Sequence, residues 1–254
     1  MGKTVAFANQ KGGVGKTTSA VNTAAALGIL GHSTLLVDLD PQGSATSGVG
    51  VAKKDLRHTV RDLLVGGCWA DDVILHTQYE KLDLIPSNIA LAGAEFDLLD
   101  GEGAEGHLAR ALDRVRDKYD YIVMDCPPSL GMLTINAMMA SENVIIPLQC
   151  EYYALEGLTQ LTTTIGRLKK RFHPSLTLTG ILVTMYQGRL SLTQQVLSEL
   201  QKHYGDRLFD TKISRNVRLS EAPSFGQPVV YYDRHAKGAK EYLAFAAELR
   251  RRIG

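Results

Sequence analysis

The residues best suited to chemistry form a short run near the start of the chain. That run is Lys11-Gly12-Gly13-Val14-Gly15-Lys16-Thr17-Thr18. Its glycines allow the backbone to come close to a polyanion and to aim successive N–H groups at phosphate oxygens. The Gly-Lys-Thr core predicts that Lys16 contacts the β- and γ-phosphates of a nucleotide and that the Thr17 hydroxyl ligates Mg²⁺. The run therefore predicts a phosphate-binding loop for a nucleoside triphosphate and Mg²⁺.

The residues on either side supply the elements that such a loop needs. The apolar run 4–8 precedes it and favours a strand, and the alanine-rich run 19–30 follows it and favours a helix. Strand, glycine loop and helix is the context of a phosphate-binding loop, and the helix start adds a partial positive charge. A glycine turn with two solvated lysines is the alternative, and this context makes it much the weaker interpretation.

One position departs from the standard phosphate-loop pattern. Gln10 stands where that pattern has glycine, and a second lysine, Lys11, begins the loop. The form K-G-G-x-G-K-T-T resembles the deviant Walker A motif of the ParA/MinD ATPases. The resemblance implies that the nucleotide is ATP. It also implies that Lys11 reaches across a dimer interface to the nucleotide of the partner subunit.

Two aspartates at predicted strand ends complete the predicted site. The apolar run 34–40 is typical of a buried parallel strand, which places Asp40 at its carboxyl end, where open α/β sheets bind ligands. Residues 121–125 are four apolar residues followed by Asp125, a Walker B pattern whose carboxylate holds Mg²⁺ directly or through water. The resemblance implies that Asp40 orients the attacking water, while a loop-capping carboxylate is the alternative. We place Thr17, Asp40 and Asp125 at the metal.

Further along the chain, strands and helices alternate with short connections. Additional strands are predicted at 82–87, 143–148, 176–185 and 208–213. Additional helices are predicted at 59–64, 88–99, 105–118, 155–172, 192–204 and 240–253, with loops at 101–104 and 215–224. This alternation predicts an α/β fold, a P-loop NTPase-like, doubly wound and mostly parallel sheet with helices on both faces. No boundary is visible, so we expect one domain over 1–254.

Composition narrows the class of protein. A hydrophobic content of 44% with 22% charged residues is ordinary for a soluble globular protein. The three cysteines have no metal-ligand spacing and are too few for a disulfide framework, which favours a reducing compartment. No signal peptide is recognisable, and no apolar run approaches the ~20 residues of a membrane span. We therefore expect a cytoplasmic protein.

Charge is distributed unevenly along the chain. Residues 1–166 hold 12 Lys/Arg and 20 Asp/Glu, whereas residues 167–254 hold 16 and 7. Such asymmetry is typical of a basic face for a polyanion. Solvated helix faces whose charges intermix in the fold explain the same numbers, and charge alone leaves both interpretations open.

The last third of the chain adds to the resemblance. The run 215–224, R-N-V-R-L-S-E-A-P-S, closely matches a segment of Soj-like chromosomal ParA proteins. The match implies that Asn216 belongs to the adenine pocket, although Ser214 stands where the family commonly has proline.

The same resemblance implies a surface for DNA. Arg189 and Arg218 match arginines that the family uses for sequence-independent binding, and Lys237 and Lys240 are candidates for the same face. Phosphate contacts need only cations spread along a surface, which gives salt-sensitive affinity without base readout. Scattered solvated arginines are the alternative.

Together, the three ordered motifs and the C-terminal match identify a member of the ParA/Soj type. The resemblance implies an ATP-driven homodimer that binds double-stranded DNA nonspecifically. It also implies a ParB-type centromere-binding partner that stimulates slow ATP hydrolysis, a nucleoid-associated location and no membrane partner. Because the chain enters a strand at once, we expect the small class of these proteins, without an N-terminal helix-turn-helix region.

Three alternatives share the nucleotide loop. A MinD-like membrane switch needs an appended amphipathic C-terminal helix, whereas 240–253 is predicted to pack in the core. An iron–sulfur reductase needs paired cluster cysteines, and only Cys126 lies near the site. A metabolic P-loop ligase is disfavoured because nothing resembles a small-substrate site.

Overall fold

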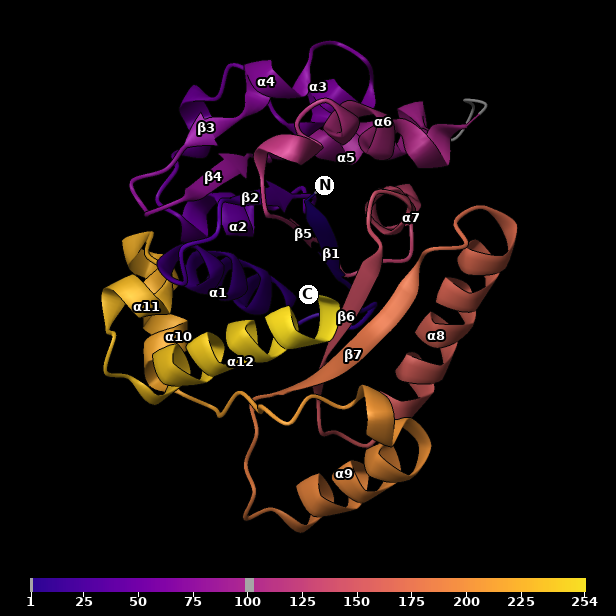
Figure 1. Cartoon of the computed structure of the whole chain (residues 1–254), viewed down its shortest axis with the longest axis vertical. Helices are drawn as coiled ribbons and strands as arrows, with labels where there is room; N and C mark the ends of the chain where they lie inside the picture. Colours follow the sequence, from indigo (N-terminus) through magenta and orange to yellow (C-terminus); the bar gives the residue numbers. More distant parts are fainter. Residues whose placement is uncertain (1, 99–102) are drawn as a thin grey trace.

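A seven-stranded sheet forms the centre of the molecule (Figure 1) in a computed structural model that describes residues 2–98 and 103–254. The strand order is β3-β4-β2-β5-β1-β6-β7, and every neighbouring pair is parallel except β3 with β4. The strands are β1 Lys3–Phe7, β2 Thr34–Asp38, β3 Leu75–His76, β4 Leu82–Ile85, β5 Tyr121–Asp125, β6 Asn143–Gln149 and β7 Thr177–Thr184. The predicted doubly wound, mostly parallel sheet is confirmed.

Helices cover both faces of this sheet (Figure 1). The α-helices are α1 Lys16–Ile29, α2 Ser44–Gly48, α3 Val60–Leu64, α4 Ala70–Val73, α5 Leu91–Asp97, α6 His107–Asp113, α7 Met132–Met139, α8 Ala154–Arg171, α9 Ser191–Tyr204, α10 Val217–Glu221, α11 Val229–Tyr232 and α12 Lys237–Ile253. Short 3₁₀ helices occur at η1 Lys53–Asp55, η2 Ala104–Gly106, η3 Arg116–Lys118, η4 Gly205–Arg207 and η5 Ala222–Phe225.

Alternate residues of the central strands enter two separate cores. In β1, Val5 and Phe7 pack with α1 and α12 on one face, while Ala6 packs with the helices of the other face, including α7 and α8. Strands covered in this way must be apolar on both sides, which explains the continuous hydrophobic runs of β1, β2 and β5. The register brings the carboxyl ends of these strands together, because Asp125 of β5 pairs with Phe7 of β1 and with Asp38 of β2.

The last helix, α12, packs on α1. Tyr242 and Phe245 of α12 are buried, and the Tyr242 hydroxyl lies 3.0 Å from that of Ser19. The Phe245 ring meets Phe7 of β1 edge-on. The expectation of a core-packing final helix is confirmed. Among the described residues, no helix combines the length and the hydropathy needed to cross a bilayer.

The strand predicted at 208–213 does not form. This segment follows β7 through isolated parallel bridges at Leu208 and, just beyond it, Ser214, and the Ile213 amide donates to the carbonyl of Val183 at 2.9 Å. The amides of Asp210 and Thr211 instead donate to the Glu248 carboxylate on α12, each at 2.9 Å. Because these amides are bound by a side chain, a regular ladder with β7 is lost.

Three other elements differ from the sequence prediction. The loop predicted at 215–224 is largely helical, since it contains α10 and η5. The helix predicted at 105–118 is broken into a 3₁₀ turn, α6 and η3, although its stripe of Leu108, Leu112 and Val115 is buried as predicted. Helix α5 begins at Leu91, and its predicted end at Leu99 lies outside the described residues, as does part of the loop predicted at 101–104.

Candidate nucleotide-binding site

The glycine loop between β1 and α1 has the backbone of an anion site. Gly13 and Gly15 adopt φ values of +73° and +83°, a left-handed conformation that strains any residue with a side chain. Gly15 is the N-cap of α1, so the helix starts at Lys16. The first N–H groups of a helix have no intrahelical acceptor, and in α1 these groups follow directly on the glycine loop. The predicted strand–loop–helix arrangement is confirmed in position and conformation.

Lys16 is held inside the site. Its side chain is buried, and Nζ donates to the carbonyl of Lys11 at 3.0 Å. Burial lowers the pKa of the Lys16 ammonium, and the charges of Asp125 and Asp40 act in the opposite direction. A buried cation that faces two carboxylates and curls over its own loop is well placed for a phosphate group.

Asp38 and Asp125 lie side by side at the carboxyl ends of β2 and β5, and both are fully buried. Asp38 accepts hydrogen bonds from the amide and hydroxyl of Thr46, both at 2.7 Å, and from the amide of Asp40 at 3.1 Å. Burial raises the pKa of the Asp38 carboxyl to about 6 despite these hydrogen bonds. Asp38 is therefore a structural carboxylate whose acceptors are already in use.

Asp125 has no such support. Neither of its carboxylate oxygens has a hydrogen-bond partner of normal geometry among the described residues. Burial, and then the charge of Asp38, raise the pKa of Asp125 well above its usual range, while the neighbouring Thr17 hydroxyl lowers it. Buried polar groups in native proteins almost always have partners, so an unpaired carboxylate next to a hydroxyl fits a hard cation such as Mg²⁺.

The number of protein ligands also fits Mg²⁺. Within residues 2–98 and 103–254 there is no group of three or more His, Cys, Asp or Glu side chains that could hold a metal by themselves. Mg²⁺ is commonly bound by one or two carboxylates, with waters and substrate phosphates completing the shell. Thr17 and Asp125 are the described residues that best meet this need.

Asp40 follows β2 at the edge of the site. Its Oδ1 accepts the amide of Gln42 at 2.8 Å, and its carbonyl accepts the Ser87 hydroxyl at 2.8 Å. The capping contact that the sequence left open is therefore present. Its charge is also felt by Lys16 and Asp125, so the carboxylate belongs to the same cluster. The water-orienting role of Asp40 stays a prediction.

A cavity of about 290 Å³ opens beside the phosphate loop, between the loop and the 213–223 segment. Gly15 and Thr18 line one side, and Asn216 and Pro223 line the other. The Asn216 side chain accepts the amide of Arg218 at 2.9 Å and so caps α10. The structure thus brings Asn216 next to the phosphate loop from about 200 residues away, as an adenine-pocket residue requires.

Comparisons with known proteins agree with this geometry. A family model described as an AAA domain matches residues 2–178. The sporulation initiation inhibitor protein Soj of Bacillus subtilis (strain 168) is 51% identical over 249 residues, which cover 98% of each chain. The chain belongs to the ParA/Soj family of partitioning ATPases. The chromosome-partitioning ATPase Soj of Treponema pallidum (strain Nichols) is 48% identical over 254 residues, 100% of this chain and 99% of that one.

A solved structure has the same fold over nearly the whole chain. Cobyrinic acid a,c-diamide synthase from Mycobacterium smegmatis, with bound ADP and magnesium, superposes with a TM-score of 0.87 at 37% identity. The match covers 99% of this chain and 95% of that one. That protein carries nucleotide and magnesium on a fold that closely matches this ParA/Soj chain.

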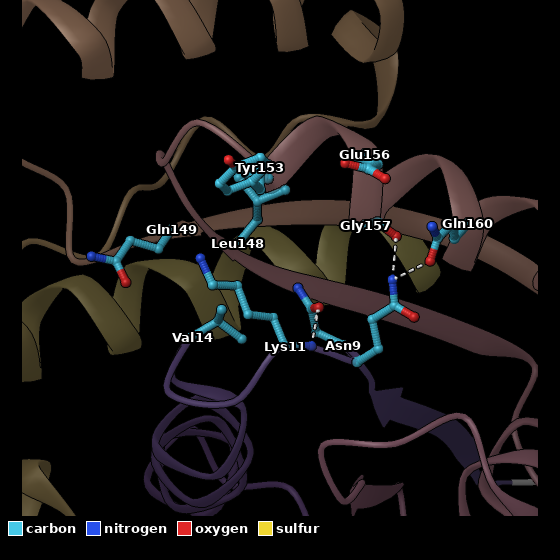
Figure 2. Close-up of a pocket in the computed structure, with 11 residues that line it drawn as sticks. Asn9, Lys11, Val14, Leu148, Gln149, Tyr153, Glu156, Gly157 and Gln160 are labelled. Carbon is cyan, nitrogen blue, oxygen red and sulfur yellow. Dashed lines mark hydrogen bonds between the residues drawn. The ribbon is translucent and has the colours of Figure 1, made fainter.

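The family's second lysine, Lys11, lies at the start of the loop and is exposed. Within this chain it forms an ion pair with Glu151, which follows β6. Figure 2 shows the Lys11 side chain extending from the phosphate loop toward the segment that carries Leu148 and Gln149. The contact across a dimer interface is not tested by a single chain and stays a prediction.

The predicted DNA-binding cations are only partly brought together. Leu219 packs closely on Gly238, so α10 with Arg218 lies against the start of α12 with Lys237 and Lys240. Arg189 lies on the separate loop between β7 and α9. All four are exposed.

Some of these cations already have acidic partners. Arg218 pairs with Glu221 at 2.7 Å and with Asp233 at 3.5 Å. Lys237 pairs with Glu241 at 3.7 Å. Their role in DNA binding stays a prediction.

Sequence reasoning missed three residues that organise the site. Asp38 was recognisable only as a second aspartate at a strand end, and its pairing with Asp125 depends on strand order. Glu151 follows β6 and gives no local signal of its contact with Lys11. Gln10 was visible as a departure from the loop pattern, but its contacts lie about 150 residues away.

Proposed function

We propose that the chain is an ATP-dependent DNA-partitioning ATPase, with residues 1–254 acting as a single deviant Walker A unit. The observation that carries the enzymatic part is the buried, unpaired carboxylate of Asp125 beside Thr17 and Lys16, at the start of α1. The partitioning part is supported by relatives named Soj and ParA that match nearly the whole chain.

Each residue of the site has a role in ATP hydrolysis. Lys16 and the backbone amides of 12–18 bind the phosphates, and Val14 and Thr18 belong to the same cradle. Thr17 and Asp125 would hold Mg²⁺, which supplies neutralisation of charge on the β- and γ-phosphates. Asp40 orients the attacking water toward the γ-phosphate.

The second lysine completes the site from another chain. With ATP bound, two copies close face to face, and Lys11 of the partner subunit approaches the phosphates. A cation placed there stabilises charge that develops during phosphoryl transfer, as an arginine finger does. A single copy lacks this cation, so turnover should be slow until the dimer and its stimulating partner are assembled.

Dimerisation would also create the DNA-binding state. Two-fold symmetry doubles the surface of Arg189, Arg218, Lys237 and Lys240, so two weak phosphate-binding faces act together. Binding through phosphates is independent of sequence and sensitive to salt. Hydrolysis, stimulated by a ParB-type centromere-binding protein, would separate the copies and release the DNA, giving a nucleoid-associated protein that cycles with ATP.

The MinD-like alternative makes a different prediction about α12. A membrane switch needs a C-terminal helix free to leave the fold, whereas α12 buries Tyr242, Phe245 and Leu249 against the α1 side of the sheet. Removing α12 from this position would expose that core, which favours the partitioning function.

Cosedimentation separates the two functions. The protein is mixed with a long double-stranded DNA of arbitrary sequence, or with vesicles containing anionic phospholipid, in ATP, ADP or no nucleotide. We expect retention on DNA in ATP alone, and retention that falls as salt rises. Binding to the vesicles in ATP, with no retention on DNA, would replace the partitioning function with the membrane one.

A further inference from the structure

We propose that Gln10 is a positioning residue for the ATP-bound dimer: its side chain joins the start of the phosphate loop to α8 and so fixes the backbone from which Lys11 projects. The inference rests on the proposed function, because it concerns the lysine that acts between subunits. It adds a residue to that function at the position where the loop departs from the standard glycine.

The contacts of Gln10 bridge two distant parts of the chain. Its Nε2 donates to the Gln160 side chain at 2.9 Å and lies 3.4 Å from the carbonyl of Gly157, both in the first half of α8. Figure 2 shows these two contacts as dashed lines that end at Gly157 and Gln160, across the cleft from Lys11 and Val14. The phosphate loop is thereby tied to the helix that follows β6.

The two residues next to Gln10 also contact the part of the chain around the end of β6. Asn9 Nδ2 donates to the carbonyl of Pro147 in β6 at 2.8 Å, and Asn9 Oδ1 accepts the amide of Lys11 at 2.9 Å. Lys11 itself pairs with Glu151. Three successive side chains thus contact the chain from β6 to α8: Asn9 contacts β6, Lys11 contacts the connecting segment, and Gln10 contacts the helix. The backbone of Lys11 lies between these anchors, so its direction depends on them.

Helix α8 has a glycine, Gly157, at the point where Gln10 approaches it. A Cβ at this position would lie 3.3 Å from Gln10 Nε2, tighter than ordinary van der Waals contact. Glycine inside a helix lowers its stability relative to alanine, so the fold alone favours a side chain here. Gly166, two and a half turns later in α8, meets nothing within 4 Å when a Cβ is added. A Cβ added at Gly157 therefore meets Gln10, whereas a Cβ added at Gly166 meets no neighbour.

This difference provides a matched pair of variants. Gly157→Ala and Gly166→Ala both raise the helix propensity of α8, but only Gly157→Ala presses on the Gln10 amide. Three further variants test the bridge itself. Gln10→Ala removes the donor and Gln160→Ala removes the acceptor, whereas Gln160→Glu keeps an acceptor for Gln10 Nε2.

Two quantities are measured for each variant. The first is the dissociation constant of the dimer in a non-hydrolysable ATP analogue and Mg²⁺, by sedimentation velocity. The second is the affinity of the single chain for ADP, by calorimetry. Because one hydrogen bond contributes modestly, we expect Gln10→Ala, Gln160→Ala and Gly157→Ala to weaken the dimer about three- to tenfold while ADP affinity changes by less than about twofold. Gln160→Glu and Gly166→Ala should behave as wild type.

The outcomes separate the inference from the function on which it rests. If the wild-type chain does not dimerise in the ATP analogue, the proposed function fails. If the wild type dimerises and Gln10→Ala dimerises equally well, the positioning role of Gln10 is wrong. Equal losses of ADP affinity and dimerisation in Gln10→Ala would also overturn it, since Gln10 would then be a structural part of the phosphate loop. Likewise, equal effects of Gly157→Ala and Gly166→Ala would overturn it.

Discussion

The nucleotide site and the cationic surface of α10 and α12 hold their charges in opposite ways. At the nucleotide site, Lys16 is 6% exposed and Asp125 is fully buried, yet the Asp125 oxygens have no hydrogen-bond partner among the described residues. On the cationic surface, the side chains of Arg218 and Lys237 are 51% and 69% exposed, and each already has a carboxylate partner.

The difference indicates what kind of ligand each region is suited to bind. The buried Asp125 carboxylate without a partner stores an unfavourable free energy that a bound cation would relieve, so the nucleotide site is prepared for one kind of ligand. Exposed ion pairs contribute little and exchange easily, so the proposed replacement of these carboxylates by DNA phosphates would cost little free energy. We therefore expect changes at the nucleotide site to act strongly and changes at the surface to act in small steps.

The largest effect is expected for Lys16→Ala. This change removes the buried cation near Asp125 and Asp40, and with it the proposed contact to the β- and γ-phosphates. Nucleotide binding should fall to background in calorimetry with ATP and Mg²⁺. Lys54→Ala, which removes an exposed lysine of η1, is the control and should bind normally. Retained ATP affinity in Lys16→Ala would mean that the loop is not the phosphate site.

A second large effect is expected for Asp40→Ala, which should separate binding from hydrolysis. The variant keeps Lys16, Thr17 and Asp125, so ATP binding and dimerisation should persist. Hydrolysis should fall by about 10²-fold, the order of magnitude of a positioned catalytic base. Release of phosphate in single-turnover conditions measures this step. A normal rate would leave Asp40 with only its turn-capping contact to Gln42.

An intermediate effect is expected for Asp125→Asn. This change should raise the stability of the fold and weaken the use of Mg²⁺ in ATP binding. Burial raises the folded-state pKa of Asp125 above its usual value, so the folded chain binds more protons than the unfolded one. Stability is then lost as pH rises through the folded pKa, and an uncharged side chain avoids this loss. Without nucleotide, Asp125→Asn should melt about 2–6 °C higher than wild type at pH 7, with a smaller gain at pH 5.

Thermal denaturation at the two pH values checks this prediction, with Asp113→Asn, at an exposed end of α6, as the control. The stabilised variant should also lose the effect of Mg²⁺ on ATP binding, because the metal site has lost its charge. A lower melting temperature for Asp125→Asn in the absence of nucleotide would contradict the picture of an unsatisfied buried carboxylate.

The smallest effect is expected for Arg218→Ala on the cationic surface. In the proposed DNA-bound state Arg218 would give up its pairs with Glu221 and Asp233, so its expected net contribution is small. The variant should lower DNA affinity several-fold and reduce the slope of log affinity against log salt by about 1 per chain. Fluorescence anisotropy over a salt series measures both, with Arg57→Ala as a control on another part of the surface. An unchanged slope would remove Arg218 from the DNA surface.

The sequence predicts those parts of the molecule that depend on neighbouring residues. The phosphate loop, Asp125 and the strand–helix alternation are specified by neighbouring residues, because glycine conformations and buried apolar strands depend on local pattern. The phosphate loop and the strand that ends at Asp125 form where predicted, whereas the helix predicted at 105–118 is broken, the loop predicted at 215–224 is largely helical, and the strand predicted at 208–213 is replaced by amides bound to Glu248. Long-range pairing of this kind has no local signature.

The remaining parts of the site depend on the order of the strands. Asp38 meets Asp125 only because β2 and β5 are neighbours, and Gln10 meets Gln160 only because β1 lies beside β6. The grouping of Arg218 with Lys237 follows from the contact of Leu219 with Gly238. Single-residue patterns cannot encode such contacts between residues distant in sequence.

The most direct test of the account is the mass of the chain in solution, measured by light scattering for wild type and Lys11→Ala, in ADP and in a non-hydrolysable ATP analogue with Mg²⁺. The account predicts that wild type has the mass of two chains in the ATP analogue and of one chain in ADP. It predicts that Lys11→Ala has the mass of one chain in both. A wild-type chain that stays single in the ATP analogue, or a Lys11→Ala variant that pairs as readily as wild type, would contradict it.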